Sequence, residues 1–183
     1  MTTLAQLEQL IGPPLREAPA ADWNELGQEY GLKFPRDYIA LTERYPELVF
    51  NEFLTVFHPC FSDAAWNDRM LNIPRSWQPK ELSVCIPAHD VIPVEWGGPF
   101  SVYPKVNGLF PWGITVNGDY CMWLTNRDPA LWTVVIANRF KVWHYRGSIV
   151  NCLNDLLSRQ VDNPLFPDDF PGNANLIVEQ IFP

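Results

Sequence analysis

Apolar residues recur at helical spacing at both ends of the chain. In "TLAQLEQLIGPP", Leu4, Leu7 and Ile11 fall on one stripe, which Gly12 and the two prolines after it should end. Near the other end, "GSIVNCLNDLLSRQV" has a broad apolar stripe and begins with Ser148, a good N-cap residue. These patterns predict a helix at the N-terminus and another after residue 148.

Two further helices are expected between residues 22 and 46. In "ADWNELGQEYG", Asp22 stands in an N-cap position with Glu25 three residues later, a capping-box pattern, and Gly31 suits the end of the helix. In "LKFPRDYIALTERYP", Pro35 suits the first turn of a third helix and Pro46 closes it. The N-terminal quarter of the chain is therefore expected to be helical.

Short apolar runs then replace the helical pattern. "ELVFNEFLTVFHP" predicts one or two strands, whereas "SDAAWNDRMLNI" could form a short helix capped by Ser62 or Asp63. From about residue 91, strands are predicted at "VIPVEW", "GLFPWGITV", "DYCMWLT", "WTVVIAN" and "KVWHYR". Asn117 and Gly118 predict a hairpin with a type I′ turn. The order of helices, strands and one helix predicts an α+β fold with a central, mostly antiparallel sheet flanked by N-terminal helices and one C-terminal helix.

Length and composition favour one folded domain. The 183 residues include eight Trp and eleven Phe, which indicates a core rich in large rings. No apolar run approaches the roughly 20 residues that span a bilayer, and the N-terminus lacks the features of a signal peptide. A cytoplasmic protein without a membrane partner is expected, with its four cysteines reduced.

The charge is concentrated in the first third of the chain. Residues 1–68 hold eleven Asp and Glu against four Lys and Arg, whereas the rest is nearly balanced, for a net charge of −8. Nucleic acid is not the expected partner, because phosphate binding needs a basic surface. An acidic face could attract a basic protein, although the same charge could serve only solubility.

Candidate chemistry is sparse. His58, His89 and His144 lack metal-ligand spacing, and the chain contains no CxxC, GxSxG, P-loop or GxGxxG motif. A nucleophilic pair of Cys121 and His144 is conceivable, but a buried thiol and a hydrogen-bonded imidazole are the preferred interpretation. We therefore expect no catalytic, cofactor-binding or metal-binding residues.

The tryptophans in the predicted strands allow another interpretation. Trp112, Trp123, Trp132 and Trp143 could stack sugars if they were exposed, but core packing is the stronger interpretation. Asp119, beside the predicted turn, is expected to form local hydrogen bonds rather than to contact a ligand.

Three segments together resemble a known family. "ADWNELGQEYGLKFPRDYIALTERYP", "FLTVFHPCFS" and "LFPWGITVNGDYCMWLTNRDPALWTVVI" are similar to the SUKH superfamily, and more narrowly to the Smi/Knr-type cell-wall assembly regulator domains of bacteria. Phe34 replaces the usual Leu, and Pro46 stands where Gly commonly follows the Tyr. The family-signature residues, expected to be structural, are Trp23, Pro35, Asp37, Tyr38, Trp112, Gly113, Asn117, Gly118, Asp119 and Trp123.

The resemblance implies one SUKH-like domain over residues 1–183, with a core at about 21–159 and a proline-rich C-terminal strap at 160–183. It also implies a non-catalytic role: bacterial members are often immunity proteins that neutralise a cognate toxin domain, and the fungal relative is a regulator of cell-wall synthesis. We expect an immunity protein that binds a basic toxin domain, with a regulatory scaffold in cell-wall synthesis or signalling as the alternative. The expected partner-binding patch consists of Asp22, Glu25, Glu29, Glu43, Glu47, Glu52 and Asp63.

Overall fold

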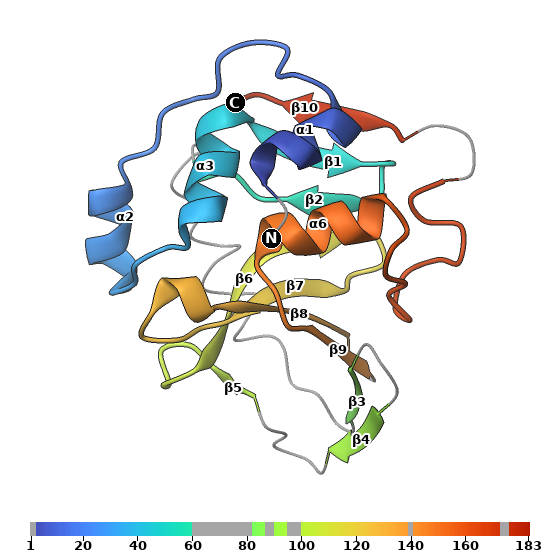
Figure 1. Cartoon of the computed structure of the whole chain (residues 1–183). Helices are drawn as coiled ribbons and strands as arrows, with labels where there is room; N and C mark the ends of the chain where they lie inside the picture. Colours follow the sequence, from blue (N-terminus) through green and yellow to red (C-terminus); the bar gives the residue numbers. More distant parts are fainter. Residues whose placement is uncertain (1–2, 60–81, 87–89, 95–99, 139–140, 173–175) are drawn as a thin grey trace.

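The computed structural model of the chain describes residues 3–59, 82–86, 90–94, 100–138, 141–172 and 176–183 (Figure 1). In this part of the chain the expected helices are present: α1 (Leu4–Ile11), α2 (Trp23–Tyr30), α3 (Arg36–Arg44) and α6 (Ile149–Leu157), with a short 3-10 turn, η2, at Pro129–Leu131. The short helix considered after Ser62 lies outside the described residues.

The strands form one continuous, mostly antiparallel sheet. They are β1 (Glu47–Phe50), β2 (Leu54–Val56), β3 (Leu82–Ile86), β4 (Asp90–Val94), β5 (Ser101–Val102), β6 (Gly108–Thr115), β7 (Tyr120–Leu124), β8 (Thr133–Ala137), β9 (Lys141–Tyr145) and β10 (Val178–Ile181). Their order is β10-β1-β2-β6-β7-β8-β9-β3-β4, with β5 beside β6. Only the β3–β9 and β5–β6 pairs of the described strands are parallel. The predicted α+β fold is confirmed.

Local chemistry explains where the helices begin and end. The Asp22 side chain accepts hydrogen bonds from the backbone N–H groups of Asn24 and Glu25, both at 3.0 Å, and so caps α2. Gly31 ends this helix in the left-handed conformation, with φ at 63°. Pro35 lies one residue before α3, and its carbonyl accepts the first bond of that helix from Ile39.

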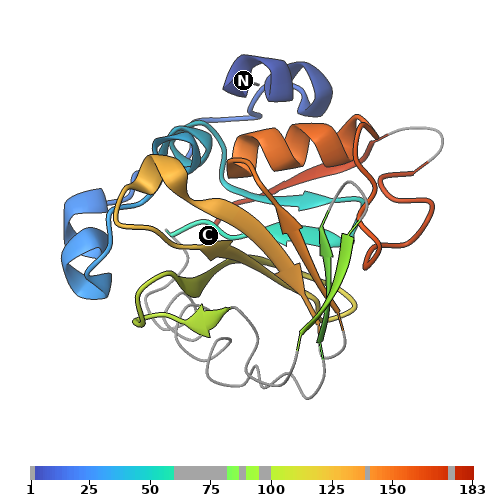
Figure 2. The same cartoon turned by 60° about the horizontal axis from the view of Figure 1, so that its bottom comes forward.

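The main core lies between the sheet and the helices α1, α3 and α6, which cover the same face (Figure 2). Large rings fill it, because Trp112, Trp123, Trp143, Tyr38 and Tyr45 all lie among the most buried side chains. Alternation along the strands sends the other side chains to a smaller apolar cluster on the opposite face, formed by Leu109, Met122, Val135, Ala137 and Val142.

The "PWG" segment forms a β-bulge in β6. Pro111 pairs with Met122 and Gly113 with Cys121, so Trp112 is the extra residue between them. Proline has no N–H to donate, and a bulge is one of the few sheet positions that tolerate this loss. The bulge directs Trp112 into the main core.

The type I′ assignment for the β6–β7 turn was wrong. That turn needs a positive φ at both central residues, and only Gly118 of the pair has one, at 82°. The Gly118 N–H instead bonds to the Thr115 carbonyl, which fits a type I turn followed by a left-handed glycine. Positive φ at two successive central positions occurs in the β1–β2 turn, at Asn51 and Glu52.

The proline-rich C-terminal strap ends in a strand. Its last part forms β10, which pairs antiparallel with β1, so that Glu47 lies opposite Ile181. Phe166 packs edge-on and Phe170 packs tilted against Phe53, with ring centroids 5.1 and 5.2 Å from it. The tail therefore completes both the sheet and the core beside the β1–β2 turn.

Candidate functional site

The acidic residues expected to form one patch are dispersed. Glu25 and Glu29 are exposed on α2, Glu43 is exposed in the last turn of α3, and Glu52 is exposed in the β1–β2 turn. In Figures 1 and 2, α2 and the β1–β2 turn lie at opposite sides of the molecule.

Two other members of the set have local roles. Glu47 is only 5% exposed, within β1, and is not available to a partner. Asp22 uses its carboxylate as the cap of α2, and Asp63 lies outside the described residues. Of the described members of the predicted patch, Glu25 and Glu29 are exposed on α2, Asp22 caps that helix, Glu47 is buried in β1, and Glu43 and Glu52 are exposed on other elements.

The signature residues in the helices join α3 to α2, to α6 and to the segment after β2. Trp23 packs edge-on against Phe34 and Tyr38, with ring centroids at 5.3 and 5.8 Å. The Tyr38 hydroxyl donates to the Phe57 carbonyl at 2.7 Å. The Asp37 carboxylate accepts a hydrogen bond from the Val150 N–H, 3.1 Å away in the first turn of α6. This contact ties α3 to the positive end of the α6 dipole.

The hairpin carboxylate is part of a buried polar network. Asp119 is 3% exposed and accepts hydrogen bonds from the Thr115 hydroxyl at 2.7 Å and from the Asn138 side-chain amide at 3.0 Å. The Asp119 N–H donates in turn to the Thr115 hydroxyl. The local role expected for Asp119 is confirmed.

The structure separates the conceivable Cys–His pair. Cys121 belongs to the main core, whereas His144 lies opposite Val135, which belongs to the smaller cluster on the other face of the sheet. Burial raises the pKa of the Cys121 thiol, and the His144 Nε2 is 2.8 Å from the Thr133 hydroxyl. A buried thiol on the opposite face cannot be activated by this imidazole.

The remaining candidate groups are metal-ligating side chains and the tryptophans of the strands. In the part of the chain that the structure describes, no three His, Cys, Asp or Glu residues are placed to hold a metal ion. Trp112, Trp123, Trp132 and Trp143 are each at most 3% exposed, so these rings are not available to stack sugars. None of the described helices has the length and apolar character to cross a membrane.

The structure instead presents two adjoining hollows that the sequence did not indicate. The basic hollow, of about 520 Å³, is lined by residues of the segments 27–33, 103–107 and 125–127 and by Trp132. The second hollow, of about 680 Å³, lies between the segments 33–39 and 128–132 and the start of α6 at Ser148 and Ile149. Lys33 and Trp132 line both, so the two form one recessed face beside α2.

The two hollows differ in charge. Lys33, Lys105 and Arg127 line the basic hollow, and none of its described lining residues is Asp or Glu. The second hollow has an apolar wall, which includes Phe34 and Ile149, with both charge signs at its edge. The three cations are far apart in the sequence, so no motif or spacing could have identified them.

Comparison of the chain with protein-family models, with curated proteins and with solved structures gives no match. The similarity to the SUKH superfamily therefore depends on the quoted segments and their motifs.

Proposed function

We propose that this chain is a non-catalytic protein-binding module, and that it acts as an immunity protein that binds and neutralises a cognate toxin domain. The sequence resemblance supports this role, and the α+β fold is of the class that the resemblance implies. Inhibition by occlusion needs a complementary contact of roughly 1,200–2,000 Å² and no chemistry from the inhibitor.

The observation that carries the proposal is the recessed face formed by the two hollows. Its edges include the loop after β5 and the segments on either side of η2, and its floor rests on the nearly buried rings of Trp123 and Trp132. Arginine is enriched in protein interfaces, and a rigid floor costs little entropy on binding. Glu25 and Glu29 on the adjacent α2 leave a short acidic edge for a basic part of the toxin.

The distribution of altered pKa values favours binding over catalysis. Active sites gather several such groups in one cleft. Of the described groups with a shifted pKa, His58, His144, Cys121 and Cys152 line neither hollow. Tyr103 lines the basic hollow, where burial raises the pKa of its hydroxyl, which donates to the Tyr30 carbonyl. That hydroxyl is committed to a structural contact.

Affinity capture tests the proposal. The tagged full chain, recovered from its native cells after a wash at moderate salt, is expected to retain one protein in stoichiometric amount, identified by mass spectrometry and inactivated by added chain. Several enzymes of cell-wall synthesis or signalling in substoichiometric amounts would instead indicate the regulatory scaffold. Recovery of the chain alone from cells that contain the candidate toxin would contradict both forms of the proposal.

A further inference from the structure

We propose that the basic hollow receives an acidic segment of the protein partner. This inference rests on the proposed function and specifies the chemistry of the contact. It reverses the expectation from the overall charge, because this hollow of an acidic protein is lined by cations.

The cations of the hollow are available to an incoming group. Lys33, Lys105 and Arg127 are all exposed. The salt bridge found between described residues, Arg44 to Glu8 at 2.7 Å, lies elsewhere and involves none of them. Three positive charges around about 520 Å³ create a local field that favours carboxylates, although the chain as a whole carries −8.

The end of α2 does not cancel this field. A helix C-terminus presents carbonyl groups that disfavour anions, and α2 ends at the basic hollow. However, the Gly27 carbonyl accepts a hydrogen bond from the Leu32 N–H at 3.1 Å. The Tyr30 carbonyl accepts one from the Tyr103 hydroxyl. The carbonyl groups at the end of α2 would repel a carboxylate, but these internal hydrogen bonds partly neutralise them.

The second hollow favours an extended peptide segment over a small ion as the ligand. It continues from the basic hollow through Lys33 and Trp132 and offers an apolar wall. Its two carboxylates are committed to backbone groups: Asp37 to the Val150 N–H, and Asp128 to the Ala130 N–H at 3.0 Å. A chain that places carboxylates in the basic hollow and an apolar side chain in the next one matches both surfaces.

Synthetic peptides test this inference. A short peptide of glutamates followed by leucine is expected to bind the full chain, more weakly as salt rises, whereas its lysine counterpart is not. The double variant Lys105→Glu/Arg127→Glu should bind the acidic peptide about tenfold less tightly or worse, because two attractive contacts become repulsive. Binding is measured by fluorescence anisotropy of labelled peptides.

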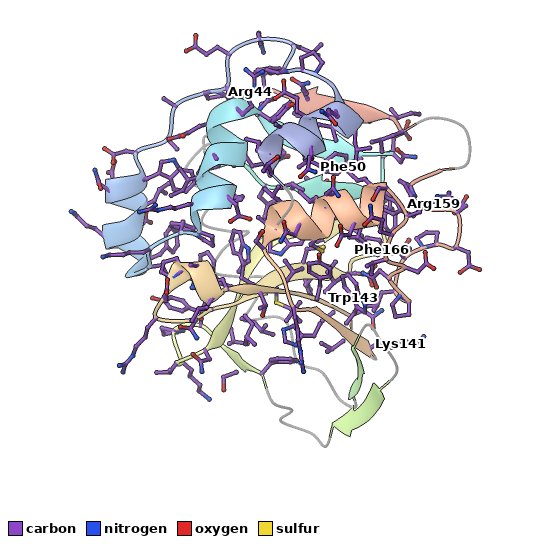
Figure 3. All side chains as sticks on the ribbon, viewed as in Figure 1. Arg44, Phe50, Lys141, Trp143, Arg159 and Phe166 are labelled. Atoms are coloured by element: carbon purple, nitrogen blue, oxygen red, sulfur yellow. The ribbon has the colours of Figure 1, made fainter. Side chains whose placement is uncertain are left out.

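Lys141→Glu is the control for a charge reversal outside the hollow. Lys141 is exposed on β9, and in the view of Figure 3 it lies on the side of the molecule away from α2. This variant should bind the acidic peptide as the wild type does. Equal losses in the two variants, or equal binding of both peptides by the wild type, would overturn the inference.

The two proposals can fail separately. If the Lys105→Glu/Arg127→Glu variant still captures the partner at wild-type affinity, the acidic segment is excluded and the binding function stands. If the acidic peptide binds in the hollow but no protein is ever captured, the hollow keeps its specificity and the immunity role is lost.

Discussion

Replacement of Trp123 by alanine is expected to lower the free energy of unfolding by about 3–5 kcal/mol, the usual cost of removing a large buried ring. Trp123 is 1% exposed and lies at the centre of the aromatic core. Its ring centroid is 4.7 Å from Tyr38 and 5.6 Å from Trp132, and the ring stacks at 6.4 Å on Phe110. The change is measured by equilibrium unfolding in urea.

Trp123→Phe keeps an aromatic ring at this position and removes part of its volume. The Trp123 Nε1 has no hydrogen-bond partner among the described residues, so phenylalanine gives up volume only. We expect Trp123→Phe to lower the free energy of unfolding by about 1–2 kcal/mol. It can therefore be measured even if Trp123→Ala does not fold. A Trp123→Ala variant as stable as Trp123→Phe would show that the ring does not organise the core.

Replacement of Gly113 by alanine is expected to cost about 3 kcal/mol, at the upper end of the range for overpacking. A Cβ at this position would lie 2.4 Å from the Thr55 carbonyl oxygen, in the neighbouring strand. Gly113 pairs with Val56 in the β2–β6 ladder, so neither backbone can move without loss of strand pairing. The readout is the midpoint of urea unfolding together with its slope.

Gly118→Ala is the matched control for the same substitution. A Cβ there meets nothing within 4 Å, although φ is +82°, so only the left-handed conformation is strained. That strain costs an alanine about 1 kcal/mol. If Gly113→Ala is no more destabilising than Gly118→Ala, close approach of β2 is not the reason for glycine in the "PWG" segment.

The helices could be predicted from the sequence because their signals are local. The Asp22 cap and the Gly31 terminator act within a few residues of the helix they delimit, and the structure places both as expected. The strands between residues 108 and 145 were likewise marked by β-branched and aromatic runs between turn residues. Periodicity and capping are properties of short segments, so one sequence suffices for them.

Features that depend on distant segments could not be predicted. Strand β10 acquires its regular structure by pairing with β1, about 130 residues earlier in the chain. The type I′ assignment failed because an Asn-Gly dipeptide also suits the type I turn with a left-handed glycine that the β6–β7 register requires. The basic hollow unites Lys33, Lys105 and Arg127 only through the tertiary fold.

The most direct test of the central claim, that the recessed face binds the partner, is the dissociation constant of the captured protein for two valine variants. Val106 lines the basic hollow and Val116 lies in the β6–β7 turn, at opposite ends of β6, and both are 73% exposed. Val106→Asp should raise the dissociation constant about tenfold or more, because it places a carboxylate at the edge of the contact, and Val116→Asp should leave it unchanged. Equal affinity for both variants, or a loss confined to Val116→Asp, would contradict binding at this face.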